Sequence, residues 1–320
     1  MLGYVVRRLL WGLLLLLLVS ALTFVIFYVL PSADPAQLRA GRSGSLATLA
    51  AIRHNLGLDR PLTVQYWTFL KRLVLHGDLG YSYYSDASVR SLLFDRIGPT
   101  VSLALGAVVV WLLVSIPIGM ISAVRPRSWL DRLTMGGALL ALSLPVYWVG
   151  LVALYLFSDD IGKWPLLPGA GSYVPLAQSP WEWFTSLIMP WLVLASTYAA
   201  IYARLLRGNL IETLSEDYVR TARAKGLSER RVILRHGLPP AAGPLMTLAG
   251  LDLGLLLGGA VLTETIFGIP GIGRLNYEAI VHADYPVIQG TVLLAAMFVI
   301  VANIAVDIGY AYLDPRVRTA

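Results

Sequence analysis

The stretch LLWGLLLLLLVSALTFVIFYVL, residues 9–30, runs for 22 residues without a charged side chain. At about 1.5 Å per residue, a helix of this length can cross the hydrocarbon core of a bilayer, which is about 30 Å thick. Because Arg7 and Arg8 precede it, the alternatives are a cleaved signal peptide and a twin-arginine signal. The run exceeds the usual signal core of about 7–15 residues, and PSAD at 31–34 is a poor cleavage site. We therefore predict a retained transmembrane helix.

Five further apolar stretches are long enough to span a membrane. Their expected limits are Thr100–Val124, Leu133–Phe157, Leu187–Leu206, Pro244–Phe267 and Val287–Leu313. The composition agrees, because 57% of the residues are hydrophobic and 14% are charged, against about 45–50% and about 25% in soluble domains. The sequence predicts an all-α membrane protein with six transmembrane helices and both termini on one side.

Positive side chains indicate which side that is, because Lys and Arg are enriched in short cytoplasmic loops. The short loops on one side hold only Lys163 and Arg274, and the long segment 31–99 holds eight more cations. The other fifteen lie at the termini and after the second and fourth spans: Arg7, Arg8, Arg125, Arg127, Arg132, Arg204, Arg207, Arg220, Arg223, Lys225, Arg230, Arg231, Arg235, Arg316 and Arg318. Both termini are therefore expected in the cytoplasm, and the net charge of +6 implies no nucleic-acid partner.

The segment after the first span is expected to form a small helical platform outside the membrane. GRSGS at 41–45 predicts a turn, with Ser45 as N-cap and Gly57 as the end of a first helix, and Val64–Leu75 continues in a helical pattern. We divide the chain accordingly into an N-terminal transmembrane helix (1–30), an extracytoplasmic segment (31–95), a main membrane domain with five spans (96–313) and a cytoplasmic tail (314–320).

The sequence contains no motif for bond chemistry. It has no G-x-x-x-x-G-K-[ST] loop for nucleotide phosphates, no H-E-x-x-H zinc motif and no G-x-S-x-G nucleophile elbow. With no cysteine, it cannot form a disulfide, a thiolate nucleophile or a cysteine metal site. These observations argue against an enzyme and predict no cofactor or metal bound by this chain.

Acidic residues inside the predicted spans raise a transport alternative. Asp252, Glu264 and Asp307 lie within apolar stretches, where ionisable groups are costly and usually face a cavity or a partner. A proton-coupled secondary transporter could use them as a relay. Glu264 and Asp307 fall near span ends, where water is expected to reach them, whereas Asp252 lies well inside. We mark Asp252 and Glu264 as candidate pore or gate residues.

The loop between the fourth and fifth spans, 209–240, has the sequence NLIETLSEDYVRTARAKGLSERRVILRHGLPP. Ser215 is a candidate N-cap for a short helix that ends at Lys225, and Gly226 can adopt the left-handed conformation that terminates helices. Ser228 can cap a second helix through His236, and the pair Pro239–Pro240 is expected to stop it. The loop is thus predicted to form a helix, a sharp turn and a helix.

The first of these helices carries small residues flanked by cations. Thr221, Ala222 and Ala224 are small, and Arg220 and Arg223 lie three positions apart on one face. Small residues let the backbone of a partner approach, and cations can pair with acids on the rim of its groove. A basic amphipathic stretch can equally rest on anionic lipid. The residues by themselves leave both interpretations open.

The same loop resembles the EAA motif of the membrane subunits of binding-protein-dependent ABC importers. That motif carries a glycine followed, after a spacer of nine, by an I-x-L-P-like end; here Gly226 precedes Leu227–Arg235 and His236-Gly237-Leu238-Pro239. Arg220 stands in the acidic place and His236 in the isoleucine place, which are departures. The string DYVRTARAKG is typical of the peptide-permease branch.

Further strings along the chain resemble the first of the two permeases of dipeptide and oligopeptide importers, a branch that includes nickel and glutathione importers. One departure is SADPA after Pro31, where the family tends to a shorter Gly-Asp-Pro form. The strings are MLGYVVRRLL (1–10), LGLDRPLTVQYW (56–67), HGDLGYS (76–82), ETIFGIPGIGRL (264–275), DYPVIQG (284–290) and DPRVR (314–318).

The resemblance implies a type I ABC importer permease fold in the cytoplasmic membrane of a prokaryote. Its expected partners are a homologous second permease, two cytoplasmic ABC ATPase subunits or one fused pair, and an extracytoplasmic substrate-binding protein. ATP and Mg would be bound by the ATPases, so this chain would be a transport subunit without an ATPase site. The coupling residues carried over are Asp217, Arg220, Thr221, Ala222, Arg223, Ala224, Lys225, Gly226 and Leu227. The substrate, whether dipeptide, oligopeptide, glutathione, nickel complex or another solute, is not specified.

Overall fold

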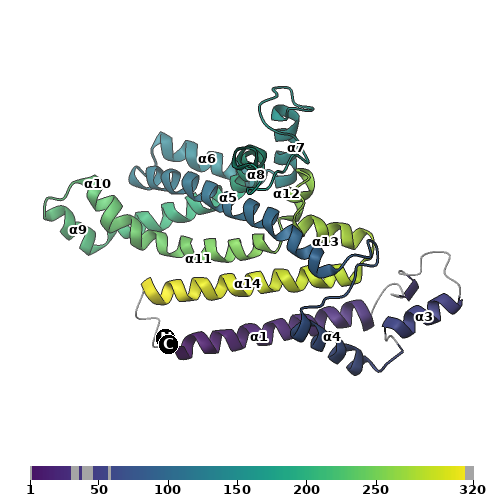
Figure 1. The fold of residues 1–320 in the computed structure, drawn as a ribbon. Helices are drawn as coiled ribbons and strands as arrows, with labels where there is room; N and C mark the ends of the chain where they lie inside the picture. Colours follow the sequence, from purple (N-terminus) through teal and green to yellow (C-terminus); the bar gives the residue numbers. More distant parts are fainter. Residues whose placement is uncertain (1, 30–35, 38–45, 57–58, 314–320) are drawn as a thin grey trace. The chain divides into compact units, whose positions relative to one another are not determined.

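The computed structural model describes residues 2–29, 36–37, 46–56 and 59–313. These residues are helical apart from turns, loops and two isolated β-bridges. The chain divides into two compact units, one within residues 1–100, 254–261 and 270–320 and the other within residues 101–253 and 262–269. Figure 1 labels the helices that they contain. We describe each unit separately.

The first unit contains helices from both ends of the chain. Its elements are α1 (Leu2–Phe24), the π-helical η1 (Val25–Val29), α3 (Leu46–Leu56), α4 (Leu62–His76), α13 (Ile272–Val281) and α14 (Tyr285–Leu313). The second unit contains α6 (Trp129–Ser143), α7 (Val146–Phe157), α8 (Pro180–Ser215), α9 (Asp217–Ala224), α10 (Glu229–Arg231), the π-helical η2 (Val232–Gly237) and α12 (Val261–Ile266), of which Val261 belongs to the first unit. Helices α5 (Val89–Val124) and α11 (Leu238–Leu257) contribute residues to both units.

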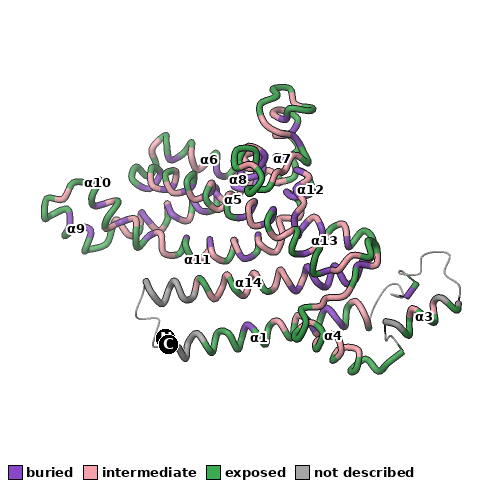
Figure 2. Tube along the Cα trace, viewed as in Figure 1, coloured by how far each residue is buried: buried purple, intermediate pink, exposed green. Residues whose placement is uncertain are grey.

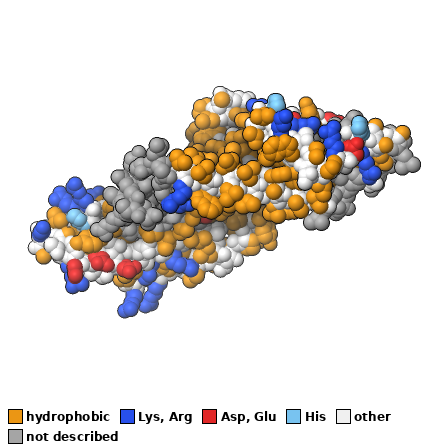
Figure 3. Space-filling model, turned by 90° about the horizontal axis from the view of Figure 1, so that it is seen from below, with side chains coloured by type: hydrophobic (Ala, Val, Ile, Leu, Met, Phe, Trp, Pro, Cys, Tyr) orange, Lys and Arg blue, Asp and Glu red, His pale blue; other side chains and the backbone are white. Residues whose placement is uncertain are grey.

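Five helical stretches are long and apolar enough to cross a membrane, and a sixth span results if the bent pair α6–α7 counts as one. This agrees with the predicted all-helical membrane fold. Most residues of α1 are exposed (Figure 2), and most of these exposed residues are hydrophobic. Figure 3 shows many hydrophobic side chains on one face of the molecule. Exposed apolar side chains of this density suit a lipid environment rather than water.

The predicted third span, Leu133–Phe157, is not one straight helix. Helices α6 and α7 meet at an angle of 99° across Ser143, Leu144 and Pro145. Leu144 has an extended backbone with φ −91° and ψ 126°. Proline disfavours the α conformation of the residue before it, so Pro145 explains why α6 ends and a new helix begins.

The predicted fifth span, Pro244–Phe267, also differs. The helix runs without a stop from Glu229 to Leu257, so the expectation that Pro239 and Pro240 end a short helix is wrong. The π-helical turn η2 precedes them, and the N–H of Leu238 donates to the Ile233 carbonyl, five residues back. In a π-helical turn each N–H bonds to the carbonyl five residues back instead of four. The helix can therefore continue into α11 although Pro239 and Pro240 have no N–H to donate. The span then ends near Gly258, and α12 is a separate short helix.

In the first unit, α14 packs against both α1 and α13. The buried carboxylate of Asp284, just before α14, accepts hydrogen bonds from the Ser82 hydroxyl and from the N–H groups of Tyr83 (3.0 Å) and Tyr84 (3.4 Å). The strings HGDLGYS and DYPVIQG therefore meet in the fold. Helices α3 and α4 agree with the predicted helical segment after the first span, whereas the expected N-cap Ser45 and stop Gly57 lie outside the described residues.

In the second unit, α8 is the central helix. It contacts α6, α7 and α9, and fourteen of its residues are buried. The indole N–H of Trp191 donates to the Ser102 carbonyl at 3.0 Å. Its ring lies so near α5 that a Cβ added to Gly106 would fall 2.0 Å from it, so only glycine fits there. This tight packing fixes the helix that leads into the predicted coupling loop.

Candidate functional site

The predicted coupling loop forms a compact hairpin of short helices at the end of α8 (Figure 1). Helix α8 continues through Ser215, and Glu216 caps α9, so the expectation that Ser215 is the N-cap is wrong. Ser228 occupies the N-cap position of α10 as predicted, although its side chain makes no capping hydrogen bond. The hairpin then enters η2 and α11 directly.

The turn between the two arms depends on Gly226. This residue has φ +78°, the left-handed conformation expected from the sequence. The N–H of Gly226 donates to the Arg223 carbonyl (2.9 Å) and that of Leu227 to the Ala222 carbonyl (3.4 Å). This pair of bonds is the Schellman arrangement that ends α-helices.

The hairpin has a small hydrophobic core of its own. Val219 and Val232 are fully buried and Ala222 is 6% exposed, with Leu214 and Leu227 packed around them. Ala222 was expected among the small residues that a partner meets, but its side chain faces this core. The two arms are thus held together by contacts made within the hairpin.

The opposite face of α9 is exposed. Arg220, Thr221, Ala224 and Lys225 are all exposed, and at 100° per residue they fall within one arc of about 140°. We call these four residues the α9 outer face. Asp217 lies within the same arc and is also exposed. Within this arc, Ala224, Asp217 and Thr221 lie near the centre, and the cations Arg220 and Lys225 lie at the edges.

The cations of the hairpin differ in their pairing. Arg223 pairs with Glu229 across the turn at 2.8 Å and also donates to the Leu214 carbonyl at 3.3 Å. Arg220 pairs with Asp217 at 3.2 Å, but both side chains are more than two-thirds exposed, so this pair contributes little stability. Tyr218 is 46% exposed, and partial desolvation of its phenol together with the nearby Glu216 carboxylate raises the pKa of that phenol. Its hydroxyl donates to the His236 carbonyl at 3.4 Å.

An ion pair between the partly exposed Arg207 and the buried Asp131 connects α8 to the start of α6 within this unit. The Nε and Nη2 atoms of Arg207 donate to the two carboxylate oxygens of Asp131 at 2.7 and 2.8 Å. The same carboxylate accepts from the Ser122 hydroxyl and from the Arg127 N–H (2.8 Å). Asp131 is buried, so all its hydrogen bonds must come from the protein. We call this ion pair the Arg207–Asp131 latch. The sequence did not reveal it, because neither residue belongs to a recognisable motif.

The two candidate pore residues have different surroundings. Asp252 is partly exposed and accepts a 2.6 Å hydrogen bond from the hydroxyl of Tyr202, a buried residue whose ring packs with Trp111 and, through it, with Tyr198. Glu264 is fully buried in α12, so the expectation that water reaches it is wrong. The side chain of Asp307 lies outside the described residues. Within the described ranges, no three His, Asp or Glu side chains gather as a metal site.

Two family models match almost the whole chain. Residues 115–319 match the binding-protein-dependent transport system inner membrane component, and residues 1–104 match the N-terminal region of the same class of membrane component. The chain belongs to this family. It is a pore-forming permease subunit of an ABC importer.

Similar curated proteins agree with this assignment. The chain is 40% identical over 318 residues to a glutathione transport system permease protein of Salmonella typhimurium and to a putative peptide transport system permease protein of Brucella abortus, with 99% of each chain covered. It is 39% identical to a glutathione transport system permease protein of Escherichia coli O6:H1 over the same length. Members of this permease family lack an ATPase site of their own. The proton-coupled alternative finds no support in these comparisons.

Proposed function

We propose that the hairpin formed by residues 215–237 is the coupling element of this permease and that its α9 outer face docks in a groove of a cytoplasmic ATPase subunit. The observation that carries the proposal is the division of α9 into two faces. One face is occupied by the hairpin's own core, and the other exposes small side chains between cations. Such a surface suits insertion into a groove with an acidic rim.

A movement of the hairpin would reach the membrane helices through the connections of α8. The hairpin is continuous with α8 on one side and with α11 on the other, and the Arg207–Asp131 latch ties α8 to the α5–α6 turn. A displacement of the hairpin would therefore move these helices together. ATP binding by the ATPases would favour one of two arrangements of the pore through differential contacts at this surface.

The full transporter would contain a homologous second permease, two ATPase subunits or one fused pair, and an extracytoplasmic binding protein. ATP and Mg would be bound by the ATPases, and both termini of this chain would be cytoplasmic. The names of the relatives favour a peptide, glutathione or a similar small solute as substrate. Asp252, partly exposed on α11, is the better of the two candidate pore residues because Glu264 is buried.

The test places a large side chain on the α9 outer face. Ala224→Trp should abolish or strongly weaken co-purification of the ATPase, because the indole would prevent close approach of the groove, while the permease still reaches the membrane. Ala224→Ser is the matched control and should retain association. A helix resting on lipid would behave differently, because tryptophan is favoured at the membrane interface. Full ATPase binding and uptake by Ala224→Trp would contradict the proposal.

A further inference from the structure

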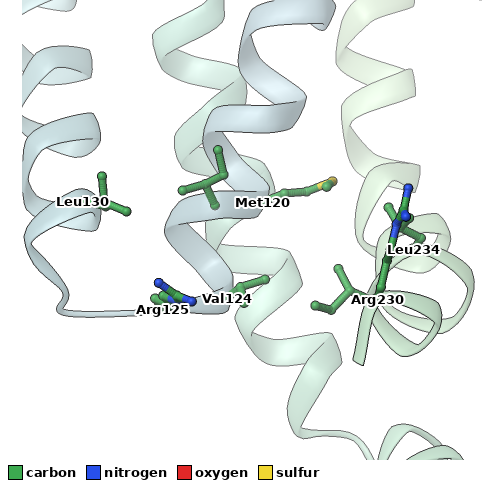
Figure 4. Close-up of a pocket in the computed structure, with 8 residues that line it drawn as sticks. Met120, Val124, Arg125, Leu130, Arg230 and Leu234 are labelled. Atoms are coloured by element: carbon green, nitrogen blue, oxygen red, sulfur yellow. The ribbon is translucent and has the colours of Figure 1, made fainter. Parts of the chain in front are cut away.

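A second surface of the same unit is a groove that shares no residue with the α9 outer face, although its α10–η2 side belongs to the hairpin. It has a volume of about 580 Å³ and lies between the end of α5, the start of α6 and the α10–η2 segment (Figure 4). Apart from two arginines, its lining is aliphatic: Met120, Ile121, Val124, Leu130, Ile233 and Leu234. Four of these side chains, Ile121, Val124, Leu130 and Leu234, are 41–49% exposed.

The position of the groove is set by the ends of apolar helices. Helix α5 ends at Val124, and the apolar helical stretch that starts at Glu229 begins beside it. Because apolar helices end here, the groove is expected where spanning helices leave the hydrocarbon region, at the level of lipid headgroups. At this depth, exposed aliphatic walls meet acyl chains and a charged rim meets polar headgroups.

Two arginines lie at the groove, Arg125 from α5's end and Arg230 from α10, and Figure 4 shows Val124 and Met120 between them. Both are exposed, and neither has an ion pair with an acid of the described chain. Arg207 and Arg223, in the same unit, are paired with Asp131 and Glu229. The cations at the groove therefore retain their capacity to bind an anion from outside the chain.

We propose that this groove binds an anionic phospholipid, with an acyl chain against the aliphatic wall and the phosphate at the arginines. A neutral lipid would fill the wall but leave the guanidinium groups without a counter-charge. A soluble anion would satisfy the arginines but leave the aliphatic wall exposed. An anionic phospholipid has an acyl chain for the aliphatic wall and a phosphate for the arginines. Basic pockets beside membrane helices are known to bind such headgroups. The proposal depends on the membrane location and not on the coupling role of the hairpin.

Native mass spectrometry of the purified full-length permease, with the subunits that co-purify, can count bound lipids. The protein would be offered equal amounts of phosphatidylglycerol and phosphatidylcholine with identical acyl chains. We expect preferential retention of phosphatidylglycerol, and we expect Arg125→Gln with Arg230→Gln to lower its occupancy about fivefold for each arginine removed. The corresponding double lysine variant should retain most of the binding.

The matched control removes the same charge beside the groove. Arg132 and Arg231 are exposed, carry no ion pair within the described chain and do not line the groove, so Arg132→Gln with Arg231→Gln should leave occupancy unchanged. Equal loss in the control, or equal retention of both lipids by the wild type, would overturn the proposal. Displacement of the lipid by inorganic phosphate would identify a soluble anion site instead. Binding by the isolated chain that disappears in the assembled complex would identify a protein occupant.

Discussion

Arg207 and Asp131 form an ion pair that holds α8 against the start of α6. Arg207→Ala would leave the Asp131 carboxylate buried with only Ser122 and the Arg127 N–H as donors. Breaking a buried pair from one side costs about 3–5 kcal/mol, and the partial exposure of Arg207, 27%, places this case toward the lower end.

Arg207→Lys should be milder, because it keeps the charge but loses the two-pronged geometry. The thermal unfolding midpoint of the detergent-purified protein should therefore fall most for Arg207→Ala and less for Arg207→Lys. Equal midpoints for the wild type and Arg207→Ala would show that the latch does not stabilise the fold.

Among single residues of the hairpin, the backbone conformation of Gly226 was predictable from the sequence, and the side-chain direction of Ala222 was not. Gly226 was expected to be left-handed because helix-ending glycines commonly are, and its φ of +78° confirms this. The inward direction of Ala222 could not be predicted, because it depends on Val232, which reaches α9 only after the turn has formed. The Arg207–Asp131 contact joins residues 76 positions apart, beyond the reach of any local pattern.

At the element scale, the hairpin core and the α9 outer face should respond differently to the same substitution. Ala222→Trp would force a large ring between Val219 and Val232, and overpacking of this kind costs about 1–3 kcal/mol. The basic residues of the hairpin make it a substrate for trypsin once it loosens. We expect rapid cleavage in this loop for Ala222→Trp.

Ala224→Trp is the comparison variant, because its side chain lies outside the core. It should resist trypsin as the wild type does, even though it is expected to lose ATPase association. Equal protection of the two variants would mean that Ala222 does not support the hairpin.

The helices themselves were predictable, but their interruptions were not. Apolar length indicated six spans, and five long helices plus the bent α6–α7 pair agree with that number. The 99° bend at Pro145 and the unbroken passage through Pro239 and Pro240 depend on how neighbouring backbone groups are satisfied. Pro145 follows an extended leucine and separates two helices, whereas Pro239 follows a π-helical turn and lies within a continuous helix. The sequence does not distinguish these two cases.

At the scale of the whole molecule, the orientation in the membrane remains a prediction from charge. The chain contains no cysteine, so introduced thiols are unambiguous labels. The test uses cells whose outer envelope is permeabilised while the cytoplasmic membrane stays intact. In these cells Gln178→Cys should react with a membrane-impermeant thiol reagent and Ser228→Cys should not. Both positions are exposed on the protein surface. The reverse labelling pattern would contradict the assignment of both termini to the cytoplasm.

Cross-linking can show whether the α9 outer face is the surface that contacts the ATPase. Ala224→Cys and Gln178→Cys would each be the only thiol of the chain, the first on the α9 outer face and the second in the loop before α8. A short thiol-to-amine reagent would be added to the complex assembled with its ATPase subunits. If the α9 outer face docks in the ATPase, Ala224→Cys gives a permease–ATPase product and Gln178→Cys gives none. An assembled, active complex in which Ala224→Cys forms no such product would contradict this docking.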